Sequence, residues 1–170
     1  MSYDYEIIYS DRRTISINIK GGALIVRAPR CAKKRDIEKL ISEHSAWIEK
    51  HLSKSKRKAE LYASLGEEDI KRLKKLARSI LPEKTRYFAE KMGIDYGRIT
   101  ITSAKTRFGS CSSLGNIAYS YRLMLYPEDA IDYVVVHELA HRREMNHSAA
   151  FYKIVASVFP DYKKRAKLLK

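Results

Sequence analysis

The stretch HELAHRREMNH, from His137 to His147, contains three of the chain's five histidines. His137 and His141 are four residues apart, so on a helix their rings project from one face, one turn apart. Two imidazoles at that spacing suit Zn²⁺, whose bonds to nitrogen are about 2.0–2.1 Å long. Glu138 is rotated about 100° around the helix axis, where it can reach a water at the metal without being a ligand. The pattern predicts a zinc site with Glu138 as general base.

A catalytic zinc site needs a third protein ligand and leaves its fourth position for water. The sequence offers Glu144 and His147. Glu144 continues the histidine face, but it lies two turns beyond His137 along the axis. His147 follows the expected end of the helix, where the chain can fold back. The spacing therefore favours one Zn²⁺ ion held by His137, His141 and His147.

The residues around this motif predict a buried helix over 127–144. Proline is tolerated in the first turn of a helix, acidic residues are favoured near its start and basic residues near its end. The corresponding residues are Pro127, Glu128, Asp129, Arg142 and Arg143.

The chain beyond this helix carries signals for a turn and a second helix. Asn146 is expected to adopt the left-handed conformation that stops a helix. Ser148 is expected to cap the next helix, which ends before Pro160.

Strands and helices alternate along the remaining chain. Residues 15–26 alternate around Gly21-Gly22, which predicts a β-hairpin. Helical stripes cover 33–51 and 70–81, and Pro82 is expected to kink the second helix or restart it. Segments 98–105 and 116–125 alternate as strands around a loop rich in Gly and Ser. The polar, basic stretch SKSKRKAE predicts a boundary between an N-terminal hairpin and helix, 1–58, and a second domain, 59–170; the alternative is one compact unit.

Composition and sequence limit the expected cellular location of the protein. Lys and Arg total 34 against 20 acidic residues, a formal net charge of +14. The first residues do not resemble a secretory signal, no apolar run is long enough for a bilayer, and two cysteines are too few for a disulfide scaffold. We expect a cytoplasmic protein that does not associate with membranes.

The excess positive charge suggests a second partner. Lys71, Lys74, Lys75 and Arg78 recur at helical spacing and can form one exposed face. We expect at most weak nucleic-acid binding without sequence preference, and such binding weakens with salt. The alternative is an ordinary solvated basic surface.

One long segment resembles a known family. RFGSCSSLGNIAYSYRLMLYPEDAIDYVVVHELAHRREMNHSAAFYKIVASVFPDYKKR is similar to the signature of the YgjP-like metallopeptidases, which are related to the SprT and WLM zinc peptidases. Phe108 stands where family members usually carry Trp. The resemblance implies an α+β fold: a zincin-like core with a small antiparallel sheet packed on helices, preceded by the N-terminal β-hairpin and helix. It also implies zinc ligands at His137, His141 and His147 and a catalytic Glu138.

The expected reaction is metal-assisted hydrolysis of peptide bonds in a peptide or protein substrate. Glu138 takes a proton from the attacking water and passes it to the leaving amine. A second donor to the oxyanion is usual in such sites. The sequence does not rank the possible donors, which are Tyr119, Tyr121, Tyr126 and Arg107.

Two details of the expected site remain open. The strand over 116–122 is either a free edge that holds an extended peptide or a paired interior strand. Cys111 is either a thiolate that blocks the open zinc position or a small buried residue in a turn.

Two rival functions come from other classes. One is a nucleic-acid-binding module with structural zinc, although structural sites usually have four protein ligands. The other is an interaction scaffold that retains its metal, and the intact Glu138 argues against it.

Overall fold

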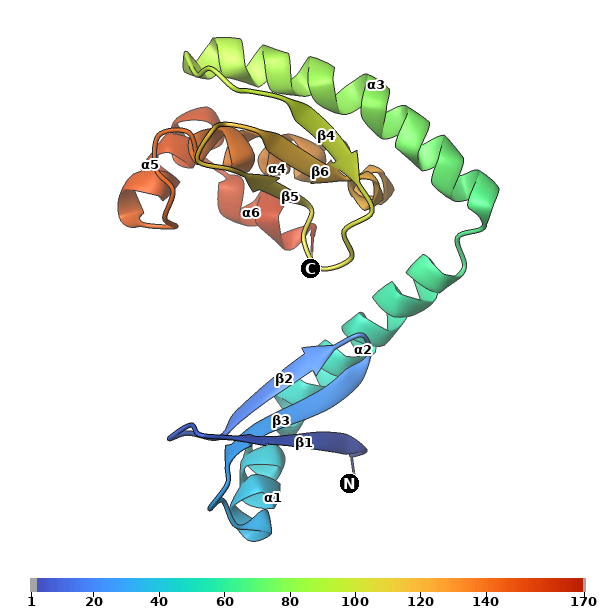
Figure 1. Cartoon of the computed structure of the whole chain (residues 1–170), viewed down its shortest axis with the longest axis vertical. Coiled ribbons are helices and arrows are strands. Elements are labelled where there is room, and N and C mark those ends of the chain that lie inside the picture. Colours follow the sequence, from blue (N-terminus) through green and yellow to red (C-terminus); the bar gives the residue numbers. More distant parts are fainter. Residues whose placement is uncertain (1–2, 170) are drawn as a thin grey trace. The chain divides into compact units, whose positions relative to one another are not determined.

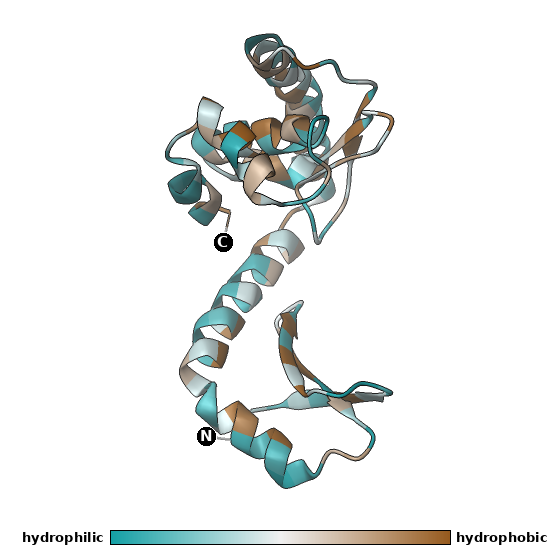
Figure 2. Cartoon of the chain, turned by 90° about the vertical axis from the view of Figure 1, so that its left-hand side faces the viewer, coloured by the Kyte–Doolittle hydropathy of each residue, from teal (hydrophilic) through white to brown (hydrophobic). Residues whose placement is uncertain are grey.

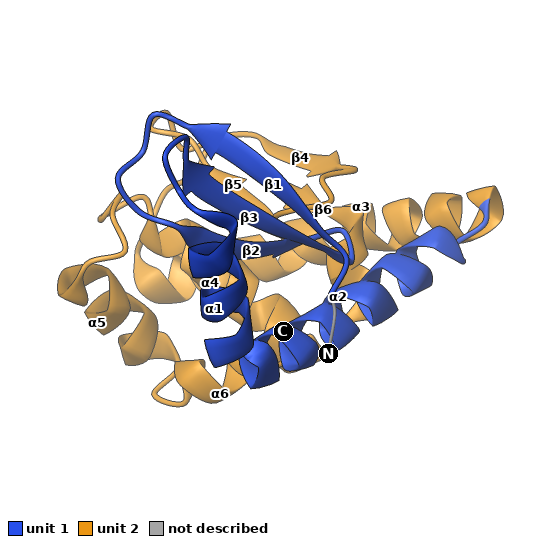
Figure 3. Ribbon diagram, turned by 90° about the horizontal axis from the view of Figure 1, so that it is seen from below, with its two compact units in different colours: residues 1–66 blue, residues 67–170 orange. Residues whose placement is uncertain are grey.

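The computed structural model describes residues 3–169 and divides into two compact units, 1–66 and 67–170 (Figure 3). Each unit has its own sheet and helices (Figure 1). Within the described residues, no helix combines the length and the apolar character needed to cross a membrane.

The N-terminal unit is built on a three-stranded sheet in the order β1-β3-β2. β2 (Ser16–Lys20) and β3 (Ala23–Pro29) form the predicted antiparallel hairpin. Gly21 and Gly22 make its turn with φ of 59° and 84°, a region that residues with a Cβ rarely adopt. β1 (Tyr5–Ser10) was not predicted as a separate strand, and it pairs in parallel with β3.

Two helices cover one face of this sheet, where the sequence pattern predicts a single helix. α1 (Lys34–Glu43) ends at His44, and α2 (Ser45–Ala63) begins directly after it. The polar stretch at residues 53–60, predicted to separate two domains, is helical and lies within α2. The boundary between the compact units instead follows Gly66.

The core of the N-terminal unit lies between the hairpin and these helices. Hydrophobic and hydrophilic residues alternate along its elements (Figure 2). The apolar side that results is buried, which stabilises the unit by removing hydrocarbon surface from water. The buried side chains are those of Leu24, Val26, Ala28, Ile37, Ile41 and Ile48.

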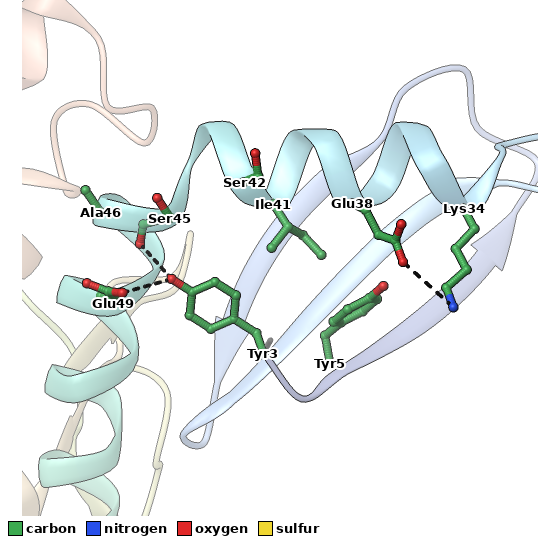
Figure 4. Close-up of a pocket in the computed structure, with 9 residues that line it drawn as sticks. All are labelled: Tyr3, Tyr5, Lys34, Glu38, Ile41, Ser42, Ser45, Ala46 and Glu49. Atoms are coloured by element: carbon green, nitrogen blue, oxygen red, sulfur yellow. Dashed lines mark hydrogen bonds and ion pairs between the residues drawn. The ribbon is translucent and has the colours of Figure 1, made fainter. Parts of the chain in front are cut away.

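A groove of about 870 Å³ runs between β1 and the two helices (Figure 4). The Tyr3 hydroxyl donates to a Glu49 carboxylate oxygen at 3.1 Å and to the Ser45 carbonyl at 3.4 Å. Lys34 pairs with Glu38 at 3.7 Å further along the groove. The two hydrogen bonds of Tyr3 connect this residue to α2.

The C-terminal unit begins with α3 (Glu67–Met92), a helix of 26 residues. Of the two alternatives predicted for Pro82, the start of a new helix was wrong, since Pro82 lies inside α3. Proline removes one backbone donor from the helix. Burial of the side chains around it, among them Leu81 and Thr85, compensates for this loss.

The second sheet has the strand order β4-β6-β5 and is mixed rather than antiparallel. β5 (Gly109–Cys111) runs antiparallel to β6 (Ile117–Ser120), whereas β4 (Ile99–Thr102) runs parallel to β6. β5 lies within the segment predicted as a loop. The expected second strand over 116–125 is shorter, because the chain turns into the 3₁₀ helix η1 (Tyr121–Leu125).

Helix α4 (Glu128–Ala140) lies at the centre of the C-terminal unit (Figure 1). It contacts α3, β5, α5 (Ala149–Val158) and α6 (Tyr162–Lys167). Pro127 precedes it as the N-cap residue, and the helix ends four residues before the predicted position 144. The predicted α+β class is confirmed, with small sheets packed on helices and strands preceding the first helix.

An ion-pair cluster joins α3 to α4. Lys84 Nζ lies 2.6 Å from Glu128 Oε1 and 2.7 Å from Asp132 Oδ1. The Lys84 and Asp132 side chains are only 20% and 17% exposed. Water therefore screens this pair less than it screens a pair on the open surface.

We expect Lys84→Met to lower the free energy of unfolding by roughly 1–2 kcal/mol at neutral pH, because Asp132 loses its counter-charge in a half-buried position. Lys71→Met is the control, since Lys71 pairs with Glu68 where both side chains are largely exposed. Chemical denaturation of both variants measures the difference. Equal losses would contradict a special role for Lys84.

The effect of Lys84→Met should also depend on pH. The hydrogen bond and charge of Lys84 lower the pKa of Glu128. The stabilisation is therefore complete above the ordinary carboxyl pKa and is lost as the pH falls through the lowered one. The stabilities of wild type and variant should converge in acid.

Candidate metal centre

Three histidine side chains meet at the end of α4. His137 comes from the last turn of α4, His141 is the residue that ends this helix, and His147 comes from the segment before α5. One ring nitrogen from each lies within 4.8 Å of the other two. The Nε2 atoms of His137 and His147 are 3.0 Å apart.

The other nitrogen of two of these rings has a partner of its own. His137 Nδ1 lies 3.4 Å from the Tyr133 hydroxyl, one helical turn earlier. His141 Nδ1 lies 3.1 Å from the backbone carbonyl of Glu144 and donates to it. A hydrogen-bond partner at Nδ1 fixes the orientation of an imidazole and leaves Nε2 free to bind a metal ion.

The Phe151 ring packs against all three imidazole rings. Its ring centroid lies 4.8, 4.6 and 4.9 Å from those of His137, His141 and His147. Phe151 is completely buried in the first turn of α5, and the Ser148 hydroxyl caps that turn by accepting from the Phe151 backbone N–H. The N-terminus of α5 therefore positions the rings.

The surroundings of His137 and His141 favour the neutral form of these two rings. Burial, together with the neighbouring His141 and His147, lowers the pKa of His137 to about 3. Burial also lowers the pKa of His141. Neutral imidazoles offer the lone pairs that a metal ion requires.

Glu138 lies beside the cluster and is 5% exposed. Burial raises the pKa of its carboxyl group to about 8, and the charge of Arg107 acts in the opposite direction. Its Oε2 atom is buried and has no hydrogen-bond partner among the described residues. A buried carboxylate oxygen without a hydrogen-bond partner raises the free energy of the folded state. This atom is therefore placed to bond to a ligand that the chain itself does not provide.

The strand β5 approaches Glu138 at Gly109. A Cβ built on Gly109 would lie 2.5 Å from Glu138 Oε1 and 2.7 Å from its Cγ and Cδ. Glycine is therefore required for this close contact between the strand and the carboxylate.

The geometry separates the two candidates for a third ligand. His147 joins the cluster, whereas Glu144 Oε1 accepts from the backbone N–H of Asn146. The prediction of a left-handed Asn146 was wrong, because no residue other than glycine among those described has a positive φ. The chain returns through a series of turns after Ala140 instead.

The four candidate oxyanion donors have different surroundings. Tyr119 is buried, and its hydroxyl lies 3.1 Å from that of Thr85. Tyr121 is buried, and the Arg122 guanidinium lies over its ring. The rings of Tyr126 and Phe108 pack with their centroids 4.8 Å apart. Arg107 is exposed and close enough to Glu138 to influence its pKa.

The structure decides the first of two sequence alternatives at the sheet and bears on the second. The strand over 116–122 is not a free edge, because β6 is the central strand between β4 and β5. Cys111 is half-buried at the end of β5 and is not one of the three residues of the cluster. Burial, and then the charge of Glu138, raise the pKa of its thiol, which disfavours a thiolate.

Sequence reasoning missed several residues that shape the site. Tyr133 precedes His137 by four residues, so helical spacing alone was sufficient to find it. Phe151 and Gly109 come from elements that only tertiary packing brings to the cluster. Every residue has a backbone carbonyl, so the residue type of Glu144 gives no sign that its carbonyl contacts His141.

The residues present fit a zinc ion. Tetrahedral coordination with bonds of about 2.0–2.1 Å places two ligand nitrogens about 3.3 Å apart, close to the observed spacing of His137 and His147. Three imidazoles and a nearby carboxylate form a donor set that zinc accepts.

A family model described as YgjP-like, metallopeptidase domain, matches residues 13–71 and 63–170. These segments cover most of the sequence, and the chain belongs to the YgjP-like metallopeptidase family. The resemblance stated from the sequence is thereby confirmed.

Two solved structures show remote likeness. The crystal structure of the metallopeptidase zymogen of Pyrococcus abyssi abylysin has a TM-score of 0.49 and 22% identity, covering 53% of this chain and 91% of that chain. The zymogen of Methanocaldococcus jannaschii jannalysin has a TM-score of 0.47 and 18% identity, covering 52% and 92%. The sequence has no significant match among curated proteins.

We expect Phe151→Leu to weaken Zn²⁺ binding about tenfold or more, because the three rings lose their common support. Phe159→Leu is the matched control, since Phe159 packs on Phe88 with ring centroids 5.4 Å apart. Competition with a chelating dye measures zinc affinity, and equal affinities in the two variants would contradict the supporting role of Phe151.

Proposed function

We propose that this chain is a zinc-dependent metallopeptidase of the HExxH type. The observation that carries the proposal is the placement of three histidines beside the buried Glu138 side chain, on and after one helix. Membership of a metallopeptidase family supports it.

The histidines have the first role. His137, His141 and His147 would hold one Zn²⁺ ion through their Nε2 atoms. When bound, this ion would acidify a water and polarise the carbonyl of the scissile bond. The partners at Nδ1 of His137 and His141 keep these rings oriented.

Glu138 has the second role. Its unpartnered Oε2 would accept a proton from the attacking water and then deliver it to the leaving amine. Burial raises the pKa of this group, so its deprotonated form is a stronger base than the carboxylate of a solvated glutamate. The Arg107 side chain is charged and exposed near Glu138, which makes it our choice among the four sequence candidates for oxyanion donor.

The sheet supplies a place for the substrate. β5 is an edge strand of the second sheet, and Gly109 brings it against Glu138. An extended peptide could add to its open edge by main-chain hydrogen bonds, which would place a peptide bond close to the base.

The alternative readings are less well supported. A structural zinc site would normally have a fourth protein ligand, and the cluster among residues 3–169 contains three. An interaction scaffold has no need of a buried, unpartnered Glu138 beside its metal, because that group is costly to retain.

We expect His147→Ala to weaken Zn²⁺ binding more than about 100-fold, because a direct ligand matters more than an orienting partner. Glu144→Gln is the control and should leave zinc affinity within a few-fold of wild type. Metal content after dialysis against a zinc buffer measures both. Unchanged occupancy in His147→Ala would exclude His147 as a ligand and return Glu144 to consideration.

Glu138→Gln is expected to retain zinc and to lose hydrolysis of an unfolded protein such as casein, by about 100-fold or more. The amide is nearly the same size as the carboxylate but cannot accept the proton. Metal content and cleavage should be measured on the same sample. Loss of zinc would show that Glu138 is a ligand, and undiminished cleavage would eliminate it as the base.

A further inference from the structure

Helix α2 presents one face that is rich in cations and contains the chain's only tryptophan. At about 100° per residue, the residues of this face fall within a sector of roughly 120° that contains no acidic residue. Ile48 and Leu52, which are buried and half-buried, point away from it. We call six residues of this sector the α2 basic face: Trp47, Lys50, His51, Lys54, Arg57 and Lys58. Leu61, in the last turn of α2, also falls within the sector.

Three cations of the α2 basic face are not neutralised. Lys50, Lys54 and Arg57 are exposed and form no ion pair with any described residue. Cations on the neighbouring helices differ, since Lys39 of α1 pairs with Glu43 and Lys71 of α3 pairs with Glu68. A row of unpaired cations on one helix repels itself and favours a polyanionic ligand.

Trp47 adds a different chemistry to this face. Its side chain is 44% exposed, which is unusual for a large apolar residue surrounded by lysines. The His51 ring lies against the indole, with centroids 4.4 Å apart and planes tilted by 30°. An exposed, supported aromatic ring is the feature on which an unpaired nucleobase stacks.

A depression of about 280 Å³ lies beside the indole. Its walls are mostly apolar, with Ser16 and His44 as the polar exceptions. An apolar depression with few polar groups suits a planar heterocycle that also carries donors and acceptors at its edge. The lining residues are Ile15, Ser16, Ile17, Leu40, His44 and Trp47.

The basic face predicted on α3 is less suitable. Lys71 is paired with Glu68, and Lys74 is half-buried with its Nζ 5.7 Å from the centre of the Tyr121 ring. Only Lys75 and Arg78 of the four predicted residues are both exposed and without an ion pair among the described residues.

We propose that the α2 basic face binds single-stranded nucleic acid. Lys50, Lys54 and Arg57 contact successive phosphates, and one base stacks on Trp47 over the adjacent depression. The binding carries no sequence preference, because phosphates and the faces of bases are common to all sequences. This function is separate from the histidine cluster and does not require a metal.

The single tryptophan makes a direct measurement possible. The full-length protein is titrated with a twelve-nucleotide oligothymidylate, and intrinsic tryptophan fluorescence is recorded. Stacking of a base on the indole should quench this fluorescence. Three phosphate contacts should give a slope of log K against log salt of about −2.

Two variants test the two parts of the proposal. Changing Lys50, Lys54 and Arg57 together to Gln should bring the slope close to zero and weaken binding at low salt. Trp47→Leu, followed by fluorescence anisotropy of a labelled oligonucleotide, should weaken binding roughly 5- to 150-fold while leaving the slope unchanged. Changing Lys71, Lys75 and Arg78 to Gln is the matched control, with the same loss of charge, and should have little effect.

Duplex DNA of the same length and polyglutamate identify the class of ligand. Both should bind more weakly than oligothymidylate and should leave tryptophan fluorescence unquenched, because neither presents an unpaired base. Equal binding of polyglutamate would make the α2 basic face a general polyanion surface and would overturn the proposal. Absence of binding at low salt, or greater loss in the α3 control than in the α2 variant, would also overturn it.

Discussion

The burial of α4 is the constraint on which the C-terminal unit depends. This helix is covered by α3, β5, α5 and α6, so it has hardly any solvent-facing side, yet it carries Glu138 and ends at His141. Removing a carboxylate from water costs several kcal/mol unless a partner compensates. The surrounding apolar residues supply the stability that permits this cost. They include Val134, Val135, Val136 and Leu139.

The turn after α4 is held by two arginines that serve neighbouring elements. Arg142 donates to the carbonyls of Asp95 and Ser113, and Arg143 donates to those of Met92 and Gly93. From their positions in the sequence, both were expected to interact with the negative end of their own helix. The structure instead uses Arg143 to satisfy carbonyls where α3 ends. These contacts fix the direction in which the chain returns toward His147.

Local patterns in the sequence predicted most of the elements and the proposed ligands. The spacing of His137 and His141 predicts their proximity because a helix places residues four apart on one face. To place His147 nearby, the chain had only to turn back within six residues. The hairpin was predictable because Gly21-Gly22 is a local signal. Local signals failed where tertiary packing overrides them: α3 passes through Pro82, and His44 divides a helical stripe without Gly or Pro.

The contacts around the histidines were predictable only where they are local. Tyr133 follows from helical spacing, but Phe151 and Gly109 reach the site from α5 and β5, and no spacing rule relates these elements to α4. The antiparallel prediction for the second sheet failed for the same reason. The parallel pairing of β4 with β6 depends on the crossover between them and not on the pattern of either strand.

The positive charge of the chain has two physical origins. In the C-terminal unit several cations are structural: Lys84 joins two helices, and Arg165 pairs with Asp129 at 2.7 Å and lies 4.1 Å from the centre of the Phe159 ring. In the N-terminal unit, Lys50, Lys54 and Arg57 of the α2 basic face form no ion pair with any described residue. Self-repulsion of such cations destabilises the folded state, so their presence is explained best by a ligand that neutralises them. The net charge therefore says little about the histidine site, and it is the arrangement of unpaired cations around an exposed Trp47 that indicates a second function.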